Sequence, residues 1–271
     1  MRPLLAALLL LALTPAAQAA PRTLCTLVTE ASTGATLLEE GDCDTRTTPA
    51  STFKLALAVI AYDAGLLTGP HAPVLPFQQG DPDWGGANWT RNTDPTDWLR
   101  YSVVWYSQRL TRQLGAATLT RYARRLNYGN ADFSGDPGHD NGLERAWIAS
   151  SLAISPREQV AFLRGLTTGS LPVSPQAMAQ TRAITESHQS GGWHLHGKTG
   201  TAYPRRADRS FDYARGYGWY VGWAEKDGRR LIFARLTQAQ ERSKGSPGQP
   251  HPQGLSGRLA KPRALRRAAQ P

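Results

Sequence analysis

The chain has 271 residues, of which 40% are hydrophobic and 19% are charged, a balance typical of a globular protein rather than a disordered one. Its formal net charge of +10 would suit a nucleic-acid-binding protein, but residues 242–271 contain seven basic side chains and no acidic one. Without those seven charges and Arg2, the net charge falls to +2. We therefore predict that the folded body binds no nucleic acid.

The first 19 residues have the pattern of a secretory signal peptide. Arg2 supplies a positive charge, LLAALLLLAL supplies an apolar core, and Ala17-Gln18-Ala19 offers small residues for cleavage after Ala19. The apolar run is short for a membrane span. We expect a periplasmic mature protein without membrane attachment; an uncleaved anchor is the minority alternative.

Residues 23–30 and 34–39 predict two strands joined at Ser32-Thr33-Gly34. Cys25 and Cys43 flank this hairpin, and their even number in an exported chain predicts a disulfide, with two free thiols as the alternative. Their spacing fits no zinc pattern, so we predict no metal site. Residues 51–66 then predict a helix that is apolar nearly all round and hence buried.

The middle of the chain is predicted to be helical, with two long loops. Residues 70–94 are rich in Pro, Gly, Asp and Asn and predict a loop, which Trp84 and Trp89 would anchor. Residues 96–126 have helical spacing with a break near Gly115, and a second loop follows over 127–142. Two further helices begin at Ser155-Pro156, which opens a capping box, and at Ser174-Pro175.

After Gly191 three segments predict strands: GWHLHGKTGTAY, GYGWYVGWAE and RRLIFARL, the last two joined by an Asp227-Gly228 turn. Strands at both ends of the chain with helices between them predict an α/β fold of the α+β type. An antiparallel sheet built from both chain ends would carry an all-helical inserted lobe. We expect one catalytic domain over 20–241, with a sheet lobe at about 20–60 plus 190–241, a helical lobe at about 61–189, and a site in the cleft between them.

Three short motifs could carry chemistry. Ser51 and Lys54 stand at i and i+3, which share one face of a helix, and a buried lysine with a lowered pKa can activate a serine nucleophile. Lys198-Thr199-Gly200 lies on a predicted strand whose edge could dock a planar amide. Ser102-Val103-Val104 lies on a predicted helix between them and would, taken alone, indicate helix core.

The three motifs occur in the order S-x-x-K, S-x-V, K-T-G, and penicillin-recognising enzymes combine S-x-x-K and K-T-G in this way. With PASTFK, DWLRYSVVWYSQ, YGNADFSG, WIASSLAISPREQVAFL and HGKTGTA, the chain resembles the class D (oxacillinase-type) serine β-lactamases from about residue 25 to 240. His194 and His196 share a strand face, but no third metal ligand is evident. We interpret them as ordinary strand residues.

The resemblance implies hydrolysis of a β-lactam through an acyl-enzyme on Ser51. Lys54 would be carboxylated by CO2 to N6-carboxylysine and act as general base, with Trp147 donating its indole N–H to the carbamate; core packing is the alternative role for Trp147. No other cofactor is expected. The remaining implied roles are a proton relay through Ser102, an apolar wall at Val104, substrate binding by Lys198, Thr199 and Gly200, an oxyanion hole from the N–H groups of Ser51 and Thr201, and a structural loop at Tyr128.

Residues 242–271 depart from this family, in which an arginine that binds the substrate carboxylate and a closing helix follow the last strand. The tail is rich in Pro, Gly and Arg, which predicts disorder, and we hypothesise a one-base frameshift near codon 249. Alternatives to an active β-lactamase are a β-lactam sensor, a penicillin-binding transpeptidase with slow turnover, and an inactive product of the frameshift. The sequence leaves the oligomeric state and the preferred antibiotic open.

Overall fold

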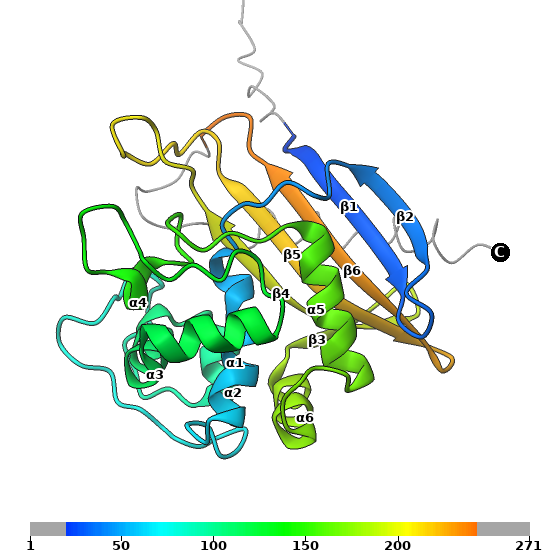
Figure 1. Cartoon of the computed structure of the whole chain (residues 1–271), viewed down its shortest axis with the longest axis horizontal. Helices are drawn as coiled ribbons and strands as arrows, with labels where there is room; N and C mark the ends of the chain where they lie inside the picture. Colours follow the sequence, from blue (N-terminus) through cyan, green and yellow to red (C-terminus); the bar gives the residue numbers. More distant parts are fainter. Residues whose placement is uncertain (1–19, 243–271) are drawn as a thin grey trace, which may run out of the picture.

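The computed structural model describes residues 20–242, which form one antiparallel sheet of six strands in the spatial order β2-β1-β6-β5-β4-β3 (Figure 1). The strands are β1 (Arg22–Glu30), β2 (Thr36–Gly41), β3 (Ser187–Ser190), β4 (Trp193–Ala202), β5 (Tyr217–Lys226) and β6 (Arg229–Gln238). The N-terminal hairpin joins the C-terminal strands where β1 pairs with β6. The predicted α+β fold, with a sheet built from both ends of the chain, is confirmed.

Helices cover one face of this sheet. Within residues 20–242 they are a 3-10 helix η1 (Ala50–Thr52) and the α-helices α1 (Phe53–Asp63), α2 (Pro95–Arg100), α3 (Val104–Arg125), α4 (Gly142–Arg145), α5 (Pro156–Thr168) and α6 (Pro175–Ile184). Figure 1 shows α5 lying across the sheet and α1 leading away from it toward α2, α3 and α4. The sheet and the group of helices distant from it therefore do not correspond to continuous stretches of the chain. Helix α5 packs on the sheet, although the segments before and after it in the sequence are also helical.

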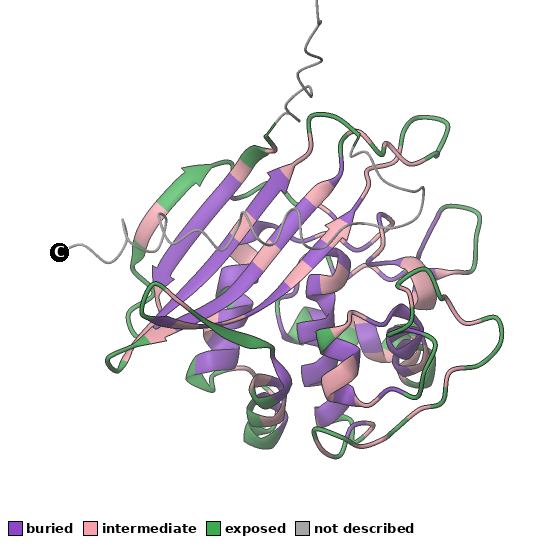
Figure 2. Ribbon diagram, turned by 180° about the vertical axis from the view of Figure 1, so that it is seen from behind, coloured by how far each residue is buried: buried purple, intermediate pink, exposed green. Residues whose placement is uncertain are grey.

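Helix α1 is the centre of the molecule. Every residue from Phe53 to Tyr62 is buried (Figure 2), which explains why its sequence is apolar nearly all round. It packs against α3 and α6 and follows directly from η1, which itself contacts β4. A rigid, fully buried helix thus fixes the backbone of residues 51–54 against the sheet.

The predicted helix starts are confirmed in atomic detail. Ser155 and Glu158 form a reciprocal capping box at the start of α5, and Ser174 accepts a hydrogen bond from Ala177 N at the start of α6. Gly115 interrupts α3 with φ 76° and ψ 157°, at the predicted break. These features depend on local sequence, which is why the sequence was sufficient to place them.

Two local expectations were wrong. Ser102 does not lie on a helix: it stands in the turn between α2 and α3 with φ 57°, in the left-handed region. Strand β3 was not expected, because its sequence SHQS carries no strand pattern; it is largely exposed and pairs with residues 193–196 of β4.

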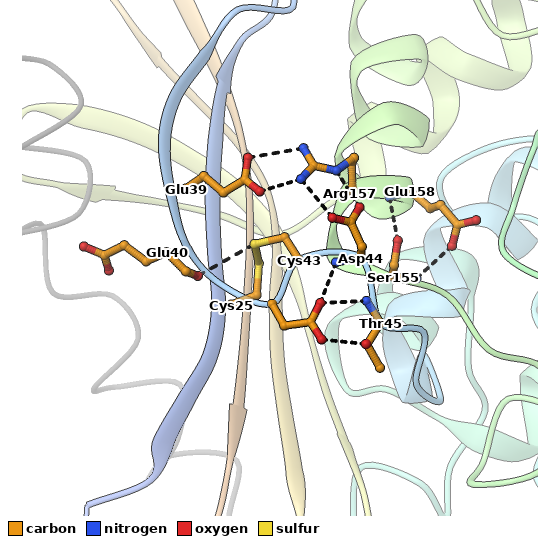
Figure 3. The surroundings of a disulfide bond; sticks show 10 residues. Cys25, Glu39, Glu40, Cys43, Asp44, Thr45, Ser155, Arg157 and Glu158 are labelled. Atoms are coloured by element: carbon orange, nitrogen blue, oxygen red, sulfur yellow. Dashed lines mark hydrogen bonds and ion pairs between the residues drawn. A yellow bond between two sulfur atoms is a disulfide. The ribbon is translucent and has the colours of Figure 1, made fainter.

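The predicted disulfide is confirmed. Cys25 on β1 bonds to Cys43 just after β2, with a Cα–Cα distance of 5.1 Å (Figure 3). Around it, Arg157 of α5 forms ion pairs with Glu39 and Asp44. The hairpin edge of the sheet is thus joined covalently to the segment that leads toward Ser51, and electrostatically to α5.

No helix within residues 20–242 is long and apolar enough to cross a membrane. The predicted signal peptide at residues 1–19 lies outside the described residues, as does the tail beyond Arg242 with the hypothesised frameshift.

Candidate active site

The nucleophile candidate Ser51 lies at the junction of η1 and α1, and Lys54 lies one turn later. Lys54 Nζ is 3.3 Å from Ser51 Oγ, and the lysine side chain is 0% exposed. Burial, together with the nearby charge of Lys198, lowers the pKa of Lys54 well below its usual value. The amine is therefore poised to exist in its neutral form beside a hydroxyl, as nucleophilic catalysis requires.

The second lysine, Lys198, reaches the same centre from β4. Its side chain is 5% exposed, and burial lowers its pKa to about 8, partly offset by the charge of Glu186. Nζ donates a hydrogen bond to Thr199 O at 3.1 Å. The two buried amines lie close enough to repel each other, and this repulsion further favours a neutral Lys54.

The edge of β4 is open where it passes Ser51. Strand β3 pairs only with residues 193–196, which leaves the part of β4 from Lys198 to Thr201 without a neighbour on that side within residues 20–242. Gly200 has no side chain to hold the strand away, and its ideal Cβ position lies 3.1 Å from Ser51 N. A free strand edge with backbone N–H and C=O groups beside a nucleophile can bind an extended amide.

Trp147 lies in an aromatic cluster next to Phe53. Its ring centroid is 5.3 Å from that of Phe53, which also contacts Tyr128 and Phe133. Trp147 is 1% exposed, yet its indole N–H has no hydrogen-bond partner within residues 20–242. Buried indole N–H groups usually have a partner, so this N–H is a donor available to an acceptor group.

The sequence did not reveal Thr48, the residue that positions Trp147. Thr48 Oγ1 donates to Trp147 O and accepts from Ala149 N, both at 2.9 Å, and Thr48 O accepts from the Trp219 indole of β5 at 2.9 Å. Its hydroxyl thus joins the segment before Ser51 to the loop that carries Trp147. A lone threonine before a proline gives no sequence signal for such a contact.

Hydrogen bonds from α5 and within the turn also stabilise the turn that carries Ser51. Gln159 of α5 donates to Thr52 Oγ1 at 2.7 Å, and Thr52 Oγ1 donates to Pro49 O at 2.7 Å. Tyr128 is 1% exposed and lies beside these groups; burial raises its pKa, which keeps the phenol protonated. Its contacts are with the nucleophile's supporting residues.

Ser102 lies in the α2–α3 turn, and Val104 follows directly after this turn. Ser102 is partly exposed, whereas Val104, the first residue of α3, is 6% exposed and belongs to the core. Among the seven non-glycine residues with positive φ within residues 20–242 are Ala50, Ser102 and Ala149. Ala50 precedes Ser51, Ser102 lies in the α2–α3 turn and Ala149 follows Trp147 by two residues, and such conformations are common at functional sites whose surroundings over-determine the backbone.

Within residues 20–242 no group of three or more His, Cys, Asp or Glu side chains could hold a metal ion. The two strand histidines pack together at 4.4 Å, and His196 stacks on Trp223 at 4.9 Å, far along β4 from Gly200. The prediction that they are ordinary strand residues fits this packing.

A hydroxyl beside a desolvated amine, a second lysine and a free strand edge together define a serine acyl-transfer site. The family described as "Penicillin binding protein transpeptidase domain" matches residues 24–252. The chain is 41% identical to β-lactamase OXA-9 of Klebsiella pneumoniae, over 81% of this chain and 80% of that protein. It is 35% identical to β-lactamase OXA-1 of Escherichia coli, over 77% and 74%. The crystal structure of OXA-427 class D β-lactamase superposes with a TM-score of 0.80 at 44% identity, covering 90% of this chain and 99% of that one.

The chain therefore belongs to the class D β-lactamases.

Proposed function

We propose that this protein hydrolyses β-lactam antibiotics through an acyl-enzyme on Ser51, with carboxylated Lys54 as the general base. The observation that carries the proposal is the placement of a fully buried Lys54 amine 3.3 Å from Ser51 Oγ. The relatives named above are β-lactamases, which favours this substrate class.

Acylation begins with the β-lactam lying along the free edge of β4. Ser51 Oγ attacks the lactam carbonyl carbon, and the developing oxyanion accepts hydrogen bonds from the backbone N–H groups of Ser51 and Thr201. The C–N bond then breaks, and the proton that Lys54 accepted from Ser51 passes through Ser102 to the leaving nitrogen, so that Lys54 is again free to accept a proton. Lys198, Thr199 and Gly200 bind the substrate. The apolar side chain of Val104 shields the Lys54 side chain from water.

The surroundings of Lys54 fit a carbamate on Nζ. Burial lowers the pKa of the amine, which favours its neutral form, and only a neutral amine adds CO2. The charged side chain that acts on it within residues 20–242 is Lys198 rather than a carboxylate, and the buried Trp147 N–H lacks an acceptor. Carboxylated in this way, Lys54 supplies a general base that accepts the Ser51 proton in acylation and a water proton in deacylation.

Deacylation requires a water molecule to reach the ester carbonyl from the Lys54 side. Phe53 and Trp147 are both buried and pack together there, which restricts the entry of bulk solvent. Lys54 accepts a proton from the water as it adds to the carbonyl carbon, the bond to Ser51 Oγ breaks, and Lys54 returns the proton to Ser51. CO2 or bicarbonate, which forms the carbamate, and water are the small molecules required besides the substrate.

We further propose export to the periplasm after cleavage of residues 1–19. The Cys25–Cys43 disulfide supports an oxidising compartment, because such bonds are rare where thiols are kept reduced. The substrate is the one partner that this site calls for; we propose no nucleic-acid partner.

The test is turnover of a chromogenic β-lactam by the purified mature protein, with and without added bicarbonate. Turnover that rises with bicarbonate, together with a carbamate signal in 13C NMR after labelling with 13CO2, is the expected result. Trp147→Phe should lose both, whereas Trp84→Phe, a change at a 44% exposed tryptophan, should lose neither.

Other outcomes separate the alternatives. A stable mass increase at Ser51 without turnover would identify a sensor or a slow transpeptidase instead. A folded protein that is neither acylated nor active would mean that the site has been disabled, as the frameshift hypothesis allows.

A further inference from the structure

The first turn of α5 is joined to the segment that leads into Ser51. Thr47 and Ile154 exchange two backbone hydrogen bonds, from Thr47 N to Ile154 O at 3.0 Å and from Ile154 N to Thr47 O at 2.9 Å. Arg46 forms an ion pair with Glu158. Because α5 also packs on β1, β5 and β6, its first turn is a fixed support for the residues around the nucleophile.

Gln159, in this first turn, reaches the turn that contains Ser51. Gln159 is 1% exposed and Thr52 is 0% exposed. Gln159 Nε2 lies 2.7 Å from Thr52 Oγ1, and Thr52 Oγ1 lies 2.7 Å from Pro49 O. A threonine hydroxyl has one proton and a carbonyl oxygen has none, so Thr52 donates to Pro49 O and accepts from the amide of Gln159. The three groups form a hydrogen-bond chain with a fixed direction.

Thr52 holds Pro49 O twice, with its side chain at 2.7 Å and with its backbone N–H at 3.2 Å. The turn that these two bonds close contains Ser51 and Ala50, whose φ is 50°. A non-glycine residue in this left-handed region is strained and persists only when its surroundings over-determine the backbone. The peptide between Ala50 and Ser51 carries the Ser51 N–H, so the orientation of this N–H depends on how firmly the turn is closed.

We propose that Gln159 is a positioning residue for the oxyanion hole. Its amide fixes the direction of the Thr52 hydroxyl, the hydroxyl closes the turn on Pro49 O, and the closed turn directs the Ser51 N–H toward the carbonyl oxygen of the substrate. This inference rests on the proposed function above, since it concerns the same site. An oxyanion-hole donor acts because it is aligned before the reaction begins, so the effect of Gln159 should appear in acylation and not in substrate binding.

Gln159→Glu tests the direction of this hydrogen-bond chain at nearly constant shape. An ionised glutamate only accepts hydrogen bonds, so the Thr52 hydroxyl would turn toward it and release Pro49 O. The acylation rate constant for benzylpenicillin, measured by stopped flow, should fall roughly tenfold, because loss of a whole oxyanion-hole donor costs about 100-fold or more and here the donor is only displaced. The dissociation constant of the non-covalent complex should stay within about twofold.

Three further variants separate this role from simple packing. Thr52→Val removes the hydroxyl and should lose as much of the acylation rate as Gln159→Glu, whereas Thr52→Ser, which keeps the hydroxyl, should restore most of it. Gln108→Glu is the matched control for a buried carboxylate, because Gln108 is 8% exposed and donates to Glu144 O from α3. This control should be acylated at the wild-type rate.

Phenylboronic acid gives a readout that needs no leaving group. Ser51 Oγ bonds to boron, the Ser51 proton passes to Lys54, and the tetrahedral anion places a boron-bound oxygen in the oxyanion hole. Its affinity should weaken roughly tenfold in Gln159→Glu and in Thr52→Val and should match the wild type in Gln108→Glu. Residues that act through one network are not additive, so Gln159→Glu combined with Thr52→Val should lose no more than Thr52→Val alone.

A fall in both measurements that is absent from Gln108→Glu would support the proposal. A folded Gln159→Glu that is acylated and binds phenylboronic acid like the wild type, or losses that multiply in the double variant, would overturn it. If circular dichroism shows Gln159→Glu to be unfolded, Gln159→Leu takes its place, because it leaves the Thr52 hydroxyl free to rotate. A wild-type acylation rate in Gln159→Leu would likewise overturn the proposal, and a loss that disappears in the Thr52→Val background would support it.

Failure of the proposed function would give a different result. If the wild type forms no acyl-enzyme with benzylpenicillin, the proposed function falls, whereas binding of phenylboronic acid to Ser51 in the same set of variants still decides the role of Gln159.

Discussion

Gly200 of β4 lies directly against the backbone of Ser51. A Cβ added at position 200 would lie 3.1 Å from Ser51 N and 3.0 Å from Pro49 O. Neither atom can move by itself, because Ser51 lies in η1, which leads directly into the buried helix α1, and Pro49 O accepts the hydrogen bond of Thr52. The absence of a side chain at 200 therefore sets the distance between the nucleophile and the strand that docks the substrate.

Gly200→Ala should consequently lower kcat/KM roughly tenfold, because a displacement of about 1 Å at a reacting centre costs about 100-fold and the shift required here is a few tenths of an ångström. The free energy of unfolding should change little, since so small a shift disturbs the packing only slightly. Steady-state kinetics and thermal unfolding measure the two effects. Gly69→Ala is the control, because a Cβ there meets nothing within 4 Å; equal kinetics for both variants would contradict the tight packing.

Thr48→Val removes one hydroxyl while keeping the shape of the side chain. Trp147 O and Ala149 N each lose a buried hydrogen bond, so we expect a loss of about 1–3 kcal/mol in the free energy of unfolding and a lower kcat because Trp147 is no longer fixed. Urea denaturation and steady-state kinetics test this. Thr45→Val, which affects only the exposed contact with Asp42, should change neither; the same small effect at both positions would refute the role of Thr48.

Lys198 makes stability depend on pH in a direction unusual for a lysine. Below about pH 8 the folded and unfolded chains both carry the proton, and the folded state bears the cost of a buried charge. Between about 8 and the ordinary value of 10.5 the unfolded chain keeps the proton and the folded chain has lost it, so stability contributed by this group rises with pH.

The slope of that rise is at most about 1.4 kcal/mol per pH unit. Lys198→Met should remove it, so the stability of the wild type relative to the variant should increase between pH 8 and 10.5. Urea denaturation of both proteins at several pH values measures the difference. A wild-type advantage that stays level or shrinks over this range would contradict the lowered pKa of Lys198.

Reduction of the Cys25–Cys43 bond should destabilise the protein by about 3 kcal/mol, as expected for a loop closed across a separation of 18 residues. The hairpin edge would then be held by non-covalent contacts, among them strand pairing, the packing of Leu37 and Leu38, and the ion pairs of Arg157. Denaturant unfolding of the wild type and of Cys25→Ser/Cys43→Ser measures the effect. Activity at low temperature should survive, because neither sulfur touches Ser51; loss of activity without loss of stability would count against a purely structural disulfide.

Local signals in the sequence were sufficient for most elements. Alternating and apolar runs located β1, β4, β5, β6 and α1, and capping residues located α5 and α6. Local signals failed where a conformation depends on distant contacts. The turn at Ser102 and the short strand β3 are set by the packing of α3 and by the edge of β4, and neither is encoded in its own residues.

The sequence by itself determined the chemistry of this protein: a serine and a lysine one helical turn apart, a K-T-G strand, and the family to which the order of these motifs points. Only the tertiary structure decided how that chemistry is positioned. The burial of Lys54, the close approach of Gly200 to Ser51, the bridge at Thr48 and the ion pair between Asp136 and Arg209 all join residues far apart in the chain. Such contacts form only when α1, β4 and the connecting loops pack together, because desolvation and hydrogen-bond geometry are properties of the folded surroundings and not of residue type.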